Sequence, residues 1–458
     1  ELLDLFEHAS TFGSLIQIPQ AFAKKLPDLE SKLNEALESG DIFAQQSAQE
    51  LLPLVQQAKI LAKKYDAVIA NPPYMGGKGM NAALKDFAKK QFPDSKSDLF
   101  AMFIERGFDW CKDSGFNSMV TMQSWMFLSS YEAMREKLLQ DRTLSCMVHM
   151  GNGVMGIAFG TAATVMLNNH ISNYAGSFSY CENDDVNEFG IPKQFPVQNE
   201  RLKTAKPDDF KKIPGSPIAY WASEDILKIF NSFDKLSLLV KTREGLTTGS
   251  NEKFLRLWQE VDLNNIGFNI TNNNEAYQSQ KKFFPYIKGG EFRRWSGFTW
   301  SGISSGTFAV RFVPSGYMFD AKGPMGFIID KFNSKKILAF LNSSITNHFI
   351  RMLAPTMDFK LGHILNLPII KDSYNTLDIL VEKAIELSTY DWNSYETSWD
   401  FTQNPIIGMN KPNLEQAFNT WQQQNSDAVA EMKRLEEENN KLFIDAYGLQ
   451  DELTPDVP

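Results

Sequence analysis

The chain has 458 residues, a formal net charge of −9, 43% hydrophobic residues and 22% charged residues. That composition excludes a disordered or fibrous protein, and the length allows two or three domains of roughly 100–200 residues each. No apolar run approaches the roughly 20 residues of a membrane helix, and no signal peptide opens the chain. The three cysteines show neither Cys-x-x-Cys pairing nor histidines at ligand spacing, which predicts a reduced, cytoplasmic, metal-free protein with no membrane partner.

The charge is unevenly distributed along the chain. From Lys235 to Lys371 there are 18 Lys or Arg residues against 9 Asp or Glu residues, a balance of +9. From Asp372 to the end, 17 acids stand against 5 bases, a balance of −12. A basic segment inside an acidic chain is typical of a module that faces phosphates, the alternative being a solvated basic face without a polyanion partner.

The first 64 residues predict mainly helices. Residues 14–19 have the composition of a short strand, and residues 28–64 carry apolar side chains at helical spacing. The glycine-rich turn that holds an adenosine-bearing cofactor after a first strand is not found here, because the only glycines before residue 71 are Gly13 and Gly40.

The next segment predicts a strand that ends in a sharp corner. Residues 67–70 are a short apolar run, which suits a strand buried on both faces of a parallel sheet. Pro72 and Pro73 remove two backbone donors and push Asn71 out of the α region, so neither strand nor helix continues. The chain therefore leaves the sheet at its carboxyl edge, where open α/β sheets bind ligands.

This corner offers groups that suit an aromatic amine. The side-chain oxygen of Asn71 and the carbonyl of Asn71 or Pro72 are acceptors, and Tyr74 supplies an aromatic face. An exocyclic amino group has two hydrogens to donate and a ring to stack. Acceptors on those hydrogens raise the electron density on nitrogen and place it for attack on an electrophilic methyl group without a strong base.

The following elements alternate between helix and strand. Three glycines around Lys78 indicate a flexible loop of the kind that closes over a substrate, and Asp98 is placed to cap a helix. The predicted order is a helix at 98–112, a strand at 116–125, a helix at 131–140, a strand at 144–150, and a loop from 151 that enters a strand ending at 167. This succession predicts a doubly wound sheet.

The rest of the chain predicts a second domain after an exposed, irregular connection at 168–212. Ser223 caps a helix within 221–239, and residues 241–256 combine glycine and hydroxyl side chains with bases, which suits phosphates. Residues 281–295 interleave bases with aromatics, and 299–312 predict a pair of hairpin strands. The candidate DNA-binding residues are Lys78, Arg243, Thr247, Thr248, Ser250, Lys253, Lys288, Arg293, Arg294, Arg311 and Lys360.

The last third predicts helices. One is expected at 335–341, and an uncapped helix is expected near 427–447. The lone His363 is predicted to be structural. The acidic tail is expected to pack on the protein or to contact a partner protein.

The residues Asn71-Pro72-Pro73-Tyr74, and their continuation through Asn81, resemble the adenine-specific DNA methyltransferases of the bacteriophage-exclusion (BREX) phage-defence system. These are gamma-type amino-methyltransferases, and fused restriction-methylation enzymes are more distant relatives. The resemblance implies methyl transfer from S-adenosylmethionine to adenine N6 in duplex DNA after base flipping. It implies that Asn71 and Pro72 hold the amino group, that Pro73 fixes the corner, and that Tyr74 stacks on the base.

The resemblance also implies an aromatic residue before the last strand that stacks on the flipped base, and Phe159 matches that position; the alternative is that Phe159 belongs to the core. In this family the cofactor motif precedes the Asn-Pro-Pro-Tyr strand, so the expectation is that the sequence is the later part of a larger protein. A degenerate homologue that binds DNA without methylating it is the second explanation. The passage from Trp295 to Thr299 is short for the family, which predicts a missing loop. The resemblance further implies that the stretch 354–368 ends the recognition domain and packs Phe359 and Ile364 inward.

The sequence thus predicts an α/β fold: part of a doubly wound methyltransferase sheet, then an α+β target-recognition domain and a helical C-terminal segment. The boundaries are 1–212 for the catalytic part, 213–371 for target recognition and 372–458 for the acidic segment. Duplex DNA is the expected partner, with phage-defence proteins and an acidic protein that mimics DNA as further partners. The alternative function is a non-catalytic DNA-binding specificity or interaction subunit of a phage-defence complex.

Overall fold

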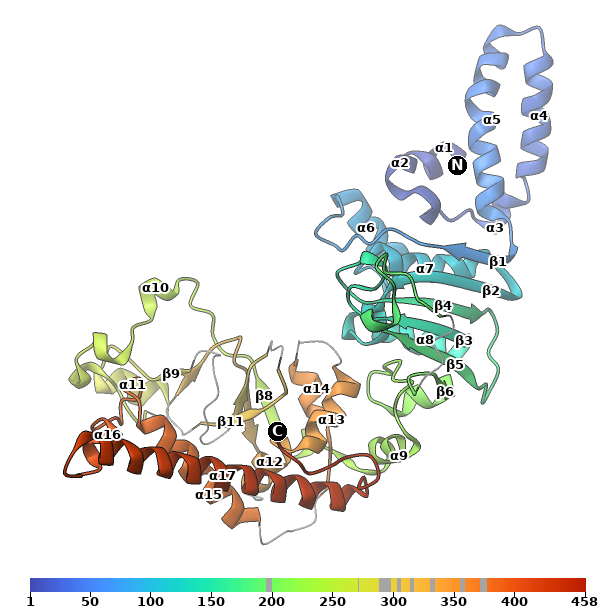
Figure 1. Cartoon of the computed structure of the whole chain (residues 1–458). Helices are drawn as coiled ribbons and strands as arrows, with labels where there is room; N and C mark the ends of the chain where they lie inside the picture. The colour runs from blue at the N-terminus through green and yellow to red at the C-terminus, as the bar shows by residue number, and fades with distance from the viewer. Residues whose placement is uncertain are drawn as a thin grey trace. The chain divides into compact units, whose positions relative to one another are not determined.

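The computed structural model describes residues 1–194, 200–270, 272–287, 298–302, 306–313, 317–329, 334–354, 359–370 and 377–458. These residues separate into two compact units, 1–222 and 223–458. Figure 1 colours the first unit from blue to green and the second from green to red. No helix in the described part of the chain is both long enough and apolar enough to cross a membrane.

The first unit is built from helices and one sheet. Its helices are α1 (Leu2–Phe6), α2 (Ala9–Phe12), α3 (Gln20–Ala23), α4 (Leu26–Glu38), α5 (Ile42–Ala62), α6 (Ala82–Gln91), α7 (Leu99–Trp110) and α8 (Glu132–Asp141). Its strands are β1 (Tyr65–Ala70), β2 (Cys111–Met122), β3 (Thr143–Met150), β4 (Thr161–Leu167), β5 (Gly176–Cys181) and β6 (Lys203–Ala205). The strand order is β1-β2-β4-β3-β5-β6.

Most described strands of this sheet run in one direction. β1 is parallel to β2 and β3 is parallel to β5, whereas β4 is antiparallel to both β2 and β3, and β6 is antiparallel to β5. Met122 at the end of β2 and Met150 at the end of β3 both pair with Thr161 at the start of β4. The carboxyl ends of β1, β2 and β3 therefore meet the beginning of β4 at one edge. The predicted α/β fold of this unit is confirmed.

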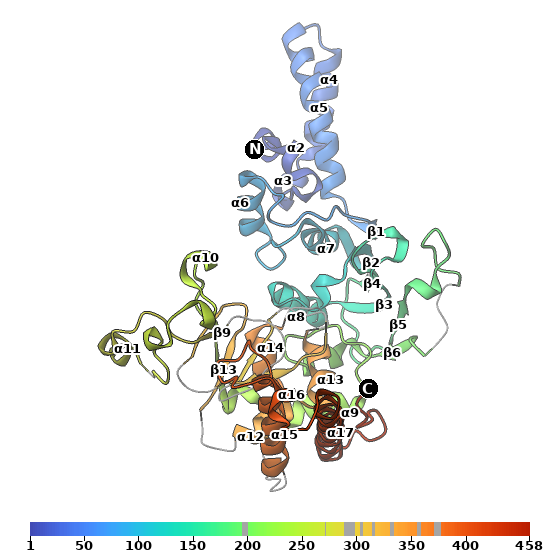
Figure 2. The same cartoon turned by 60° about the vertical axis from the view of Figure 1, so that its left-hand side comes forward.

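One face of the sheet carries the main core of this unit. Both crossover helices, α7 and α8, lie beside the sheet (Figure 2), and they contribute to a single buried cluster with strands β2 to β5. Phe100 of α7, Met134 of α8 and Phe178 of β5 are each at most 1% exposed in that cluster. Asp98 caps α7 through a hydrogen bond from the Phe100 amide, as the sequence predicted.

The prediction that residues 67–70 are buried on both faces is wrong. Among the described strands, β1 pairs with β2 alone and so lies at the sheet edge. The side chain of Ile69 is 81% exposed, and Ala67 is exposed as well. Residues 67–70 were predicted from apolar composition alone, and composition does not distinguish a central strand from an edge strand.

The helices predicted within 28–64 are confirmed, and the strand predicted at 14–19 is wrong. α4 and α5 form an antiparallel hairpin that extends away from the sheet (Figure 1). Residues 13–15 form a 3-10 helix instead of a strand. The carbonyls of Ser14 and Ile16 accept hydrogen bonds from the buried guanidinium of Arg106 on α7, at 3.2 and 2.7 Å, so their partner is a side chain rather than a strand.

The connection predicted at 168–212 is not irregular throughout. β5 and β6 lie within it and extend the sheet beyond β3. Phe178 of β5 is fully buried and stacks on Tyr220, with ring centroids 5.1 Å apart. The polar residues around this short alternating segment masked its strand character in the sequence.

The second unit combines small sheets with helices. Its strands are β7 (Asp234–Lys235), β8 (Val240–Arg243), β9 (Tyr286–Ile287), β10 (Phe298–Trp300), β11 (Val310–Phe312), β12 (Met318–Phe319), β13 (Met325–Ile328) and β14 (Pro368–Ile369). Its helices are α9 (Glu224–Ser232), α10 (Asn251–Phe254), α11 (Asn273–Ser279), α12 (Ser334–Leu341), α13 (Ser344–Leu353), α14 (Leu361–Leu365), α15 (Leu377–Asn393), α16 (Pro405–Gly408) and α17 (Leu414–Tyr447). Four described strands form an antiparallel sheet in the order β11-β10-β13-β8, which includes the hairpin predicted at 299–312.

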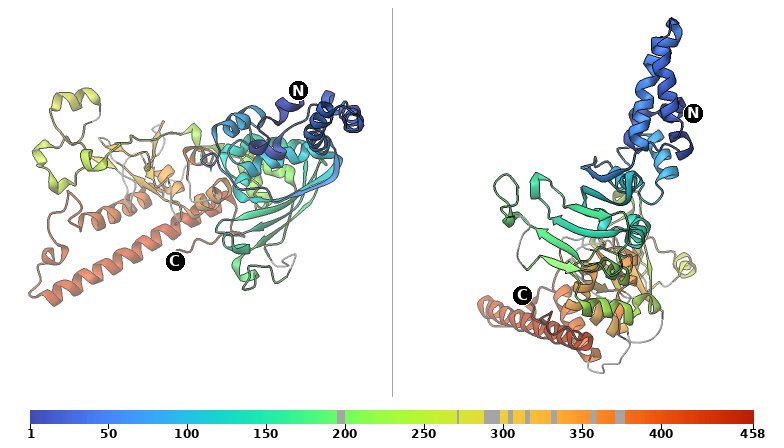
Figure 3. Two further views of the ribbon diagram at one scale, coloured as in Figure 1. Left: turned by 90° about the horizontal axis from the view of Figure 1, so that it is seen from above. Right: turned by 90° about the vertical axis from the view of Figure 1, so that its right-hand side faces the viewer.

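The acidic C-terminal helices pack on this unit. The Asn439 amide of α17 donates to the Ala339 carbonyl of α12 at 3.0 Å, and the Tyr447 hydroxyl donates to the Pro368 carbonyl at 2.7 Å. The helix predicted at 427–447 is confirmed, but it is longer and not uncapped, because α17 begins at Leu414 and the Asn413 side chain caps it. Its full length is visible as the long red helix in Figure 3.

Candidate active site

The corner after β1 lies where several strand ends meet. Ala70, the last residue of β1, pairs with Met119 of β2. Asn71 is exposed, Pro72 is buried and Pro73 is exposed. The two prolines end the strand, and the Asn71 side chain is left accessible at the carboxyl edge of the sheet.

Tyr74 connects the corner to the neighbouring strand. Its hydroxyl lies 3.4 Å from Oδ1 of Asn71 and 3.3 Å from the carbonyl oxygen of Val120 in β2, so its one hydrogen is shared between two acceptors. Burial raises the pKa of Tyr74 above its usual value, which keeps the hydroxyl a donor. A donor at this position orients the Asn71 amide and leaves a second lone pair of Oδ1 accessible.

The aromatic ring of Tyr74 lies between two other rings. Phe100 of α7 packs edge-to-face against it with a centroid distance of 6.0 Å, and Phe159 does so at 5.8 Å and an interplanar angle of 63°. Phe159 is 39% exposed, in the loop before β4. The structure therefore brings Asn71, Tyr74 and Phe159 together, although strands β2 and β3 and helices α6 to α8 separate the corner from Phe159 in the sequence.

Asp98 fixes the loop that follows the corner, which the sequence analysis missed. Besides capping α7, its Oδ1 accepts a hydrogen bond from the Met75 amide at 2.9 Å. The Leu99 amide donates to the Met75 carbonyl at 3.1 Å, and Gly77 donates to Ser97 at 3.2 Å. Burial raises the pKa of the Asp98 carboxyl, although its backbone hydrogen bonds oppose that shift. The position of Asp98 before a helix predicts only the cap. Its hydrogen bond with the Met75 amide, 23 residues earlier, has no signal in the sequence.

Only some of the candidate DNA-binding residues lie near one another in the structure. Lys78 is exposed in the glycine loop of the first unit, and the described stretch from Arg243 to Lys253 is mainly exposed. Within it, the Thr248 hydroxyl donates to the Asn251 side chain at 2.7 Å. Thr247 and Ser250 lie in the same stretch, and Lys360 precedes α14.

The sheet of the second unit separates two of the candidate arginines. Arg243 ends β8 and Arg311 lies in β11, the opposite edge strand, so about 14 Å of sheet lies between them at ~4.8 Å per strand. Arg311 donates to the Ser301 hydroxyl at 3.0 Å. Lys288, Arg293 and Arg294 lie outside the described residues, as does most of the short passage after Trp295.

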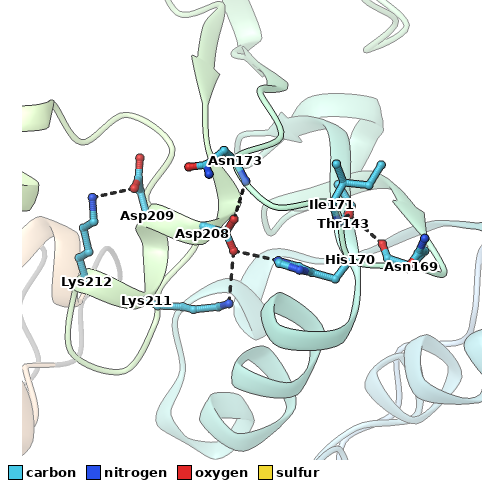
Figure 4. Close-up of polar contacts among 9 residues, drawn as sticks. All are labelled: Thr143, Asn169, His170, Ile171, Asn173, Asp208, Asp209, Lys211 and Lys212. Carbon is cyan, nitrogen blue, oxygen red and sulfur yellow. Dashed lines mark hydrogen bonds and ion pairs between the residues drawn. The ribbon is translucent and has the colours of Figure 1, made fainter.

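A second polar cluster lies at the opposite end of the strands, where β4 ends and β3 begins (Figure 4). Asp208 accepts from His170 at 2.9 Å, from the Asn173 amide at 2.9 Å and from Lys211 at 3.3 Å. Burial would raise the pKa of Asp208, but the hydrogen bonds lower it below its usual value. These groups join the loop after β4 to residues 207–212, far from the strand ends that carry Asn71, so the cluster is structural.

Neither a metal site nor a cofactor turn is formed by the residues that the structure describes. No group of three His, Cys, Asp or Glu side chains among them is placed to hold a metal ion. The described segment before Asn71 holds Gly13 and Gly40 outside any strand-to-helix turn, so it does not fit the glycine-rich cradle of an adenosine-bearing cofactor.

Comparisons with known proteins relate the chain to DNA methyltransferases. The family profile of the Eco57I restriction-modification methylase matches residues 9–155. The chain is 39% identical, over 99% of its length, to the adenine-specific methyltransferase BrxX of Escherichia coli O9:H4 strain HS. It is 36% identical, over its whole length, to the adenine-specific methyltransferase PglX of Lacticaseibacillus casei strain Zhang. It spans 40% and 42% of these two relatives.

One solved structure shares the fold over most of the chain. It is the Type IIL restriction-modification enzyme MmeI in complex with DNA, with a TM-score of 0.50 and 12% identity. The match covers 85% of this chain and 55% of that one.

Proposed function

The chain is a homologue of the adenine-specific methyltransferases BrxX and PglX and carries an Eco57I-type methylase region, and from this premise we propose that it methylates adenine N6 in duplex DNA. The methyl donor would be S-adenosylmethionine, and the biological role would be sequence-specific marking of DNA inside the cell in bacterial defence against phage. The observation that carries this proposal is the contact of Asn71 and Phe159 with the same tyrosine.

In the proposed reaction, the corner holds the amino group of the base. Oδ1 of Asn71 accepts one amino hydrogen, and the carbonyl of Asn71 or Pro72 accepts the other. These two bonds draw the nitrogen lone pair out of conjugation with the ring and direct it away from the acceptors. Bound beside this corner, S-adenosylmethionine would supply an electrophilic methyl group and would leave as the neutral thioether. Water then takes the amino proton, so no strong base is needed.

Tyr74 would act on both the amide and the base. Its hydroxyl donates toward Oδ1 of Asn71 and so holds the amide in one orientation. Its ring offers a face to a base that has left the duplex, and Phe159 offers a second ring on the exposed side. Flipping costs a few kcal/mol of lost stacking, which aromatic contacts of about 1–3 kcal/mol per base offset.

The second unit would position the DNA. The balance of +9 between Lys235 and Lys371 supports a phosphate-binding role for that segment. Arg243, Lys253, Arg311 and Lys360 are the described bases that we assign to it. An acidic protein that mimics DNA would compete for the same segment, and proteins of the defence system would contact other surfaces.

Methylation of genomic DNA tests the proposed function. Cells would express the complete protein with its neighbouring defence genes, as wild type, Asn71→Ala or Asn34→Ala. Asn34 is an exposed residue of α4 and serves as a matched control. The expected result is N6-methyladenine at one sequence motif in cells with the wild type or the control, and none with Asn71→Ala. Methylation that survives in Asn71→Ala, or is missing with the wild type, would refute the proposal.

A further inference from the structure

Gln123 lies where the ends of β2 and β3 meet the start of β4. Its backbone N–H donates to the carbonyl of Gly160 at 3.0 Å. Its carboxamide lies against the same residue, because a Cβ on Gly160 would overlap Cδ and Oε1 of Gln123. Gly160 does not have a positive φ, so glycine is needed here for the close approach of the carboxamide.

His149 holds the other side of this carboxamide. It is 7% exposed, and its Nε2 lies 2.5 Å from Oε1 of Gln123 while its Nδ1 lies 3.0 Å from the Tyr220 hydroxyl. Since Oε1 only accepts, Nε2 carries the hydrogen and Tyr220 donates to Nδ1. Burial lowers the pKa of His149 to about 4, so the neutral ring that this pattern requires is present at neutral pH.

The contacts from His149 through Gln123 and Gly160 lead to the ring pair of Phe159 and Tyr74. Phe159 directly precedes Gly160, and its ring packs edge-to-face on Tyr74. The two rings are in edge-to-face contact, with centroids 5.8 Å apart and an interplanar angle of 63°, so no base fits between them in this arrangement. Phe159 would therefore shift when a base enters, and the Gln123–Gly160 contact would hold the carboxyl end of its loop during that shift.

We propose that Gln123, locked by the buried neutral His149, is a positioning residue that sets where Phe159 stands relative to Tyr74 and Asn71. The inference rests on the proposed function, since it assigns Gln123 a role in admitting the flipped base. Gln123 acts through Gly160 and Phe159. Its loss should therefore change base capture and the rate of methyl transfer more than DNA affinity or stability.

The test compares Gln123→Met, which keeps the side-chain volume but removes the acceptor, with Gln46→Met on an exposed position of α5. With the complete protein, we would measure the methylation rate at saturating DNA, the Kd for DNA, the thermal midpoint, and the fluorescence of 2-aminopurine at the target adenine. For Gln123→Met we expect a rate loss on the order of 10- to 100-fold and a weaker 2-aminopurine signal. The Kd should match that of Gln46→Met, and the thermal midpoint should fall only modestly, because the His149 N–H loses its acceptor.

A second pair of variants separates positioning from packing. Gly160→Ala should be destabilised, because its new Cβ meets the Gln123 carboxamide. Adding Gln123→Ala removes that clash, so the double variant should regain stability while its 2-aminopurine signal and methylation rate stay low. The inference would be overturned if the double variant recovered both the 2-aminopurine signal and the methylation rate. A wild-type methylation rate in Gln123→Met would overturn it as well. The proposed function is tested separately, by methylation with the wild type and its loss in Asn71→Ala, and neither result depends on Gln123.

Discussion

At the scale of single residues, removing the Tyr74 hydroxyl tests how it orients the Asn71 amide. The role of the Tyr74 ring in stacking on the base is left in place. In Tyr74→Phe the ring remains, but the Asn71 amide loses the donor that orients it. A net hydrogen-bond contribution of about 0.5–1.5 kcal/mol predicts a rate loss of roughly 2- to 13-fold with unchanged base flipping. Single-turnover methylation and 2-aminopurine fluorescence measure the two effects. A Tyr74→Phe variant as inactive as Tyr74→Ala would contradict this assignment.

The buried histidine predicts a specific dependence of stability on pH. The pKa of His149 is lowered to about 4 in the folded state, against about 6.5 when unfolded, so the unfolded chain binds the proton more tightly. The contribution of neutral His149 to the free energy of unfolding is therefore complete above pH 6.5, and it is lost as the pH falls toward 4. The tyrosines that contact the ring, Tyr180 and Tyr220, remain uncharged over this range.

Denaturation at pH 7 and pH 5 checks this dependence. His149 should contribute about 2 kcal/mol to the difference in unfolding free energy between the two conditions. His149→Gln should lose that contribution, while His8→Gln at an exposed position should retain it. Equal pH dependence in the two variants would show that His149 is not the group responsible.

At the scale of secondary-structure elements, Asp98 joins helix α7 to the loop after the Asn71 corner. In Asp98→Ala, the Phe100 amide loses its cap and the Met75 amide loses its acceptor. We expect a loss of stability of about 1–3 kcal/mol and faster proteolysis between residues 75 and 79. Asp86→Ala on exposed α6 is the control and should change neither. Unchanged proteolysis in Asp98→Ala would mean that other contacts hold the loop.

The elements show which structural features a sequence can reveal. The caps of α7 and α9, and the corner at Asn71, were predicted because their signals lie within a few residues. The edge position of β1 and the strands β5 and β6 were not, because strand pairing is decided by distant partners. Phe159 was assigned by resemblance to a family. Gln123 and His149 were missed because their contact depends on the register that pairs both Met122 and Met150 with Thr161.

At the scale of the whole molecule, the separation of charge predicts how DNA binding responds to salt. If Arg243 and Arg311 each contact a phosphate, their change to Gln should lower the slope of log K against log salt by roughly 1 per residue. Lys433→Gln, in the acidic C-terminal segment, should leave the slope unchanged. Titrations of the complete protein with duplex DNA at several salt concentrations provide the slopes. An equal effect of all three changes would assign the binding to net charge alone.

The central claim is that Asn71 holds the amino group of adenine for methyl transfer. The most direct measurement is the transfer of labelled methyl groups from S-adenosylmethionine to duplex DNA by the purified complete protein, with identification of the modified nucleoside. The account predicts label on N6 of adenine with the wild type and with Asn34→Ala, and none with Asn71→Ala even though that variant still binds DNA. Label that persists in Asn71→Ala, or that appears on another atom, would contradict it.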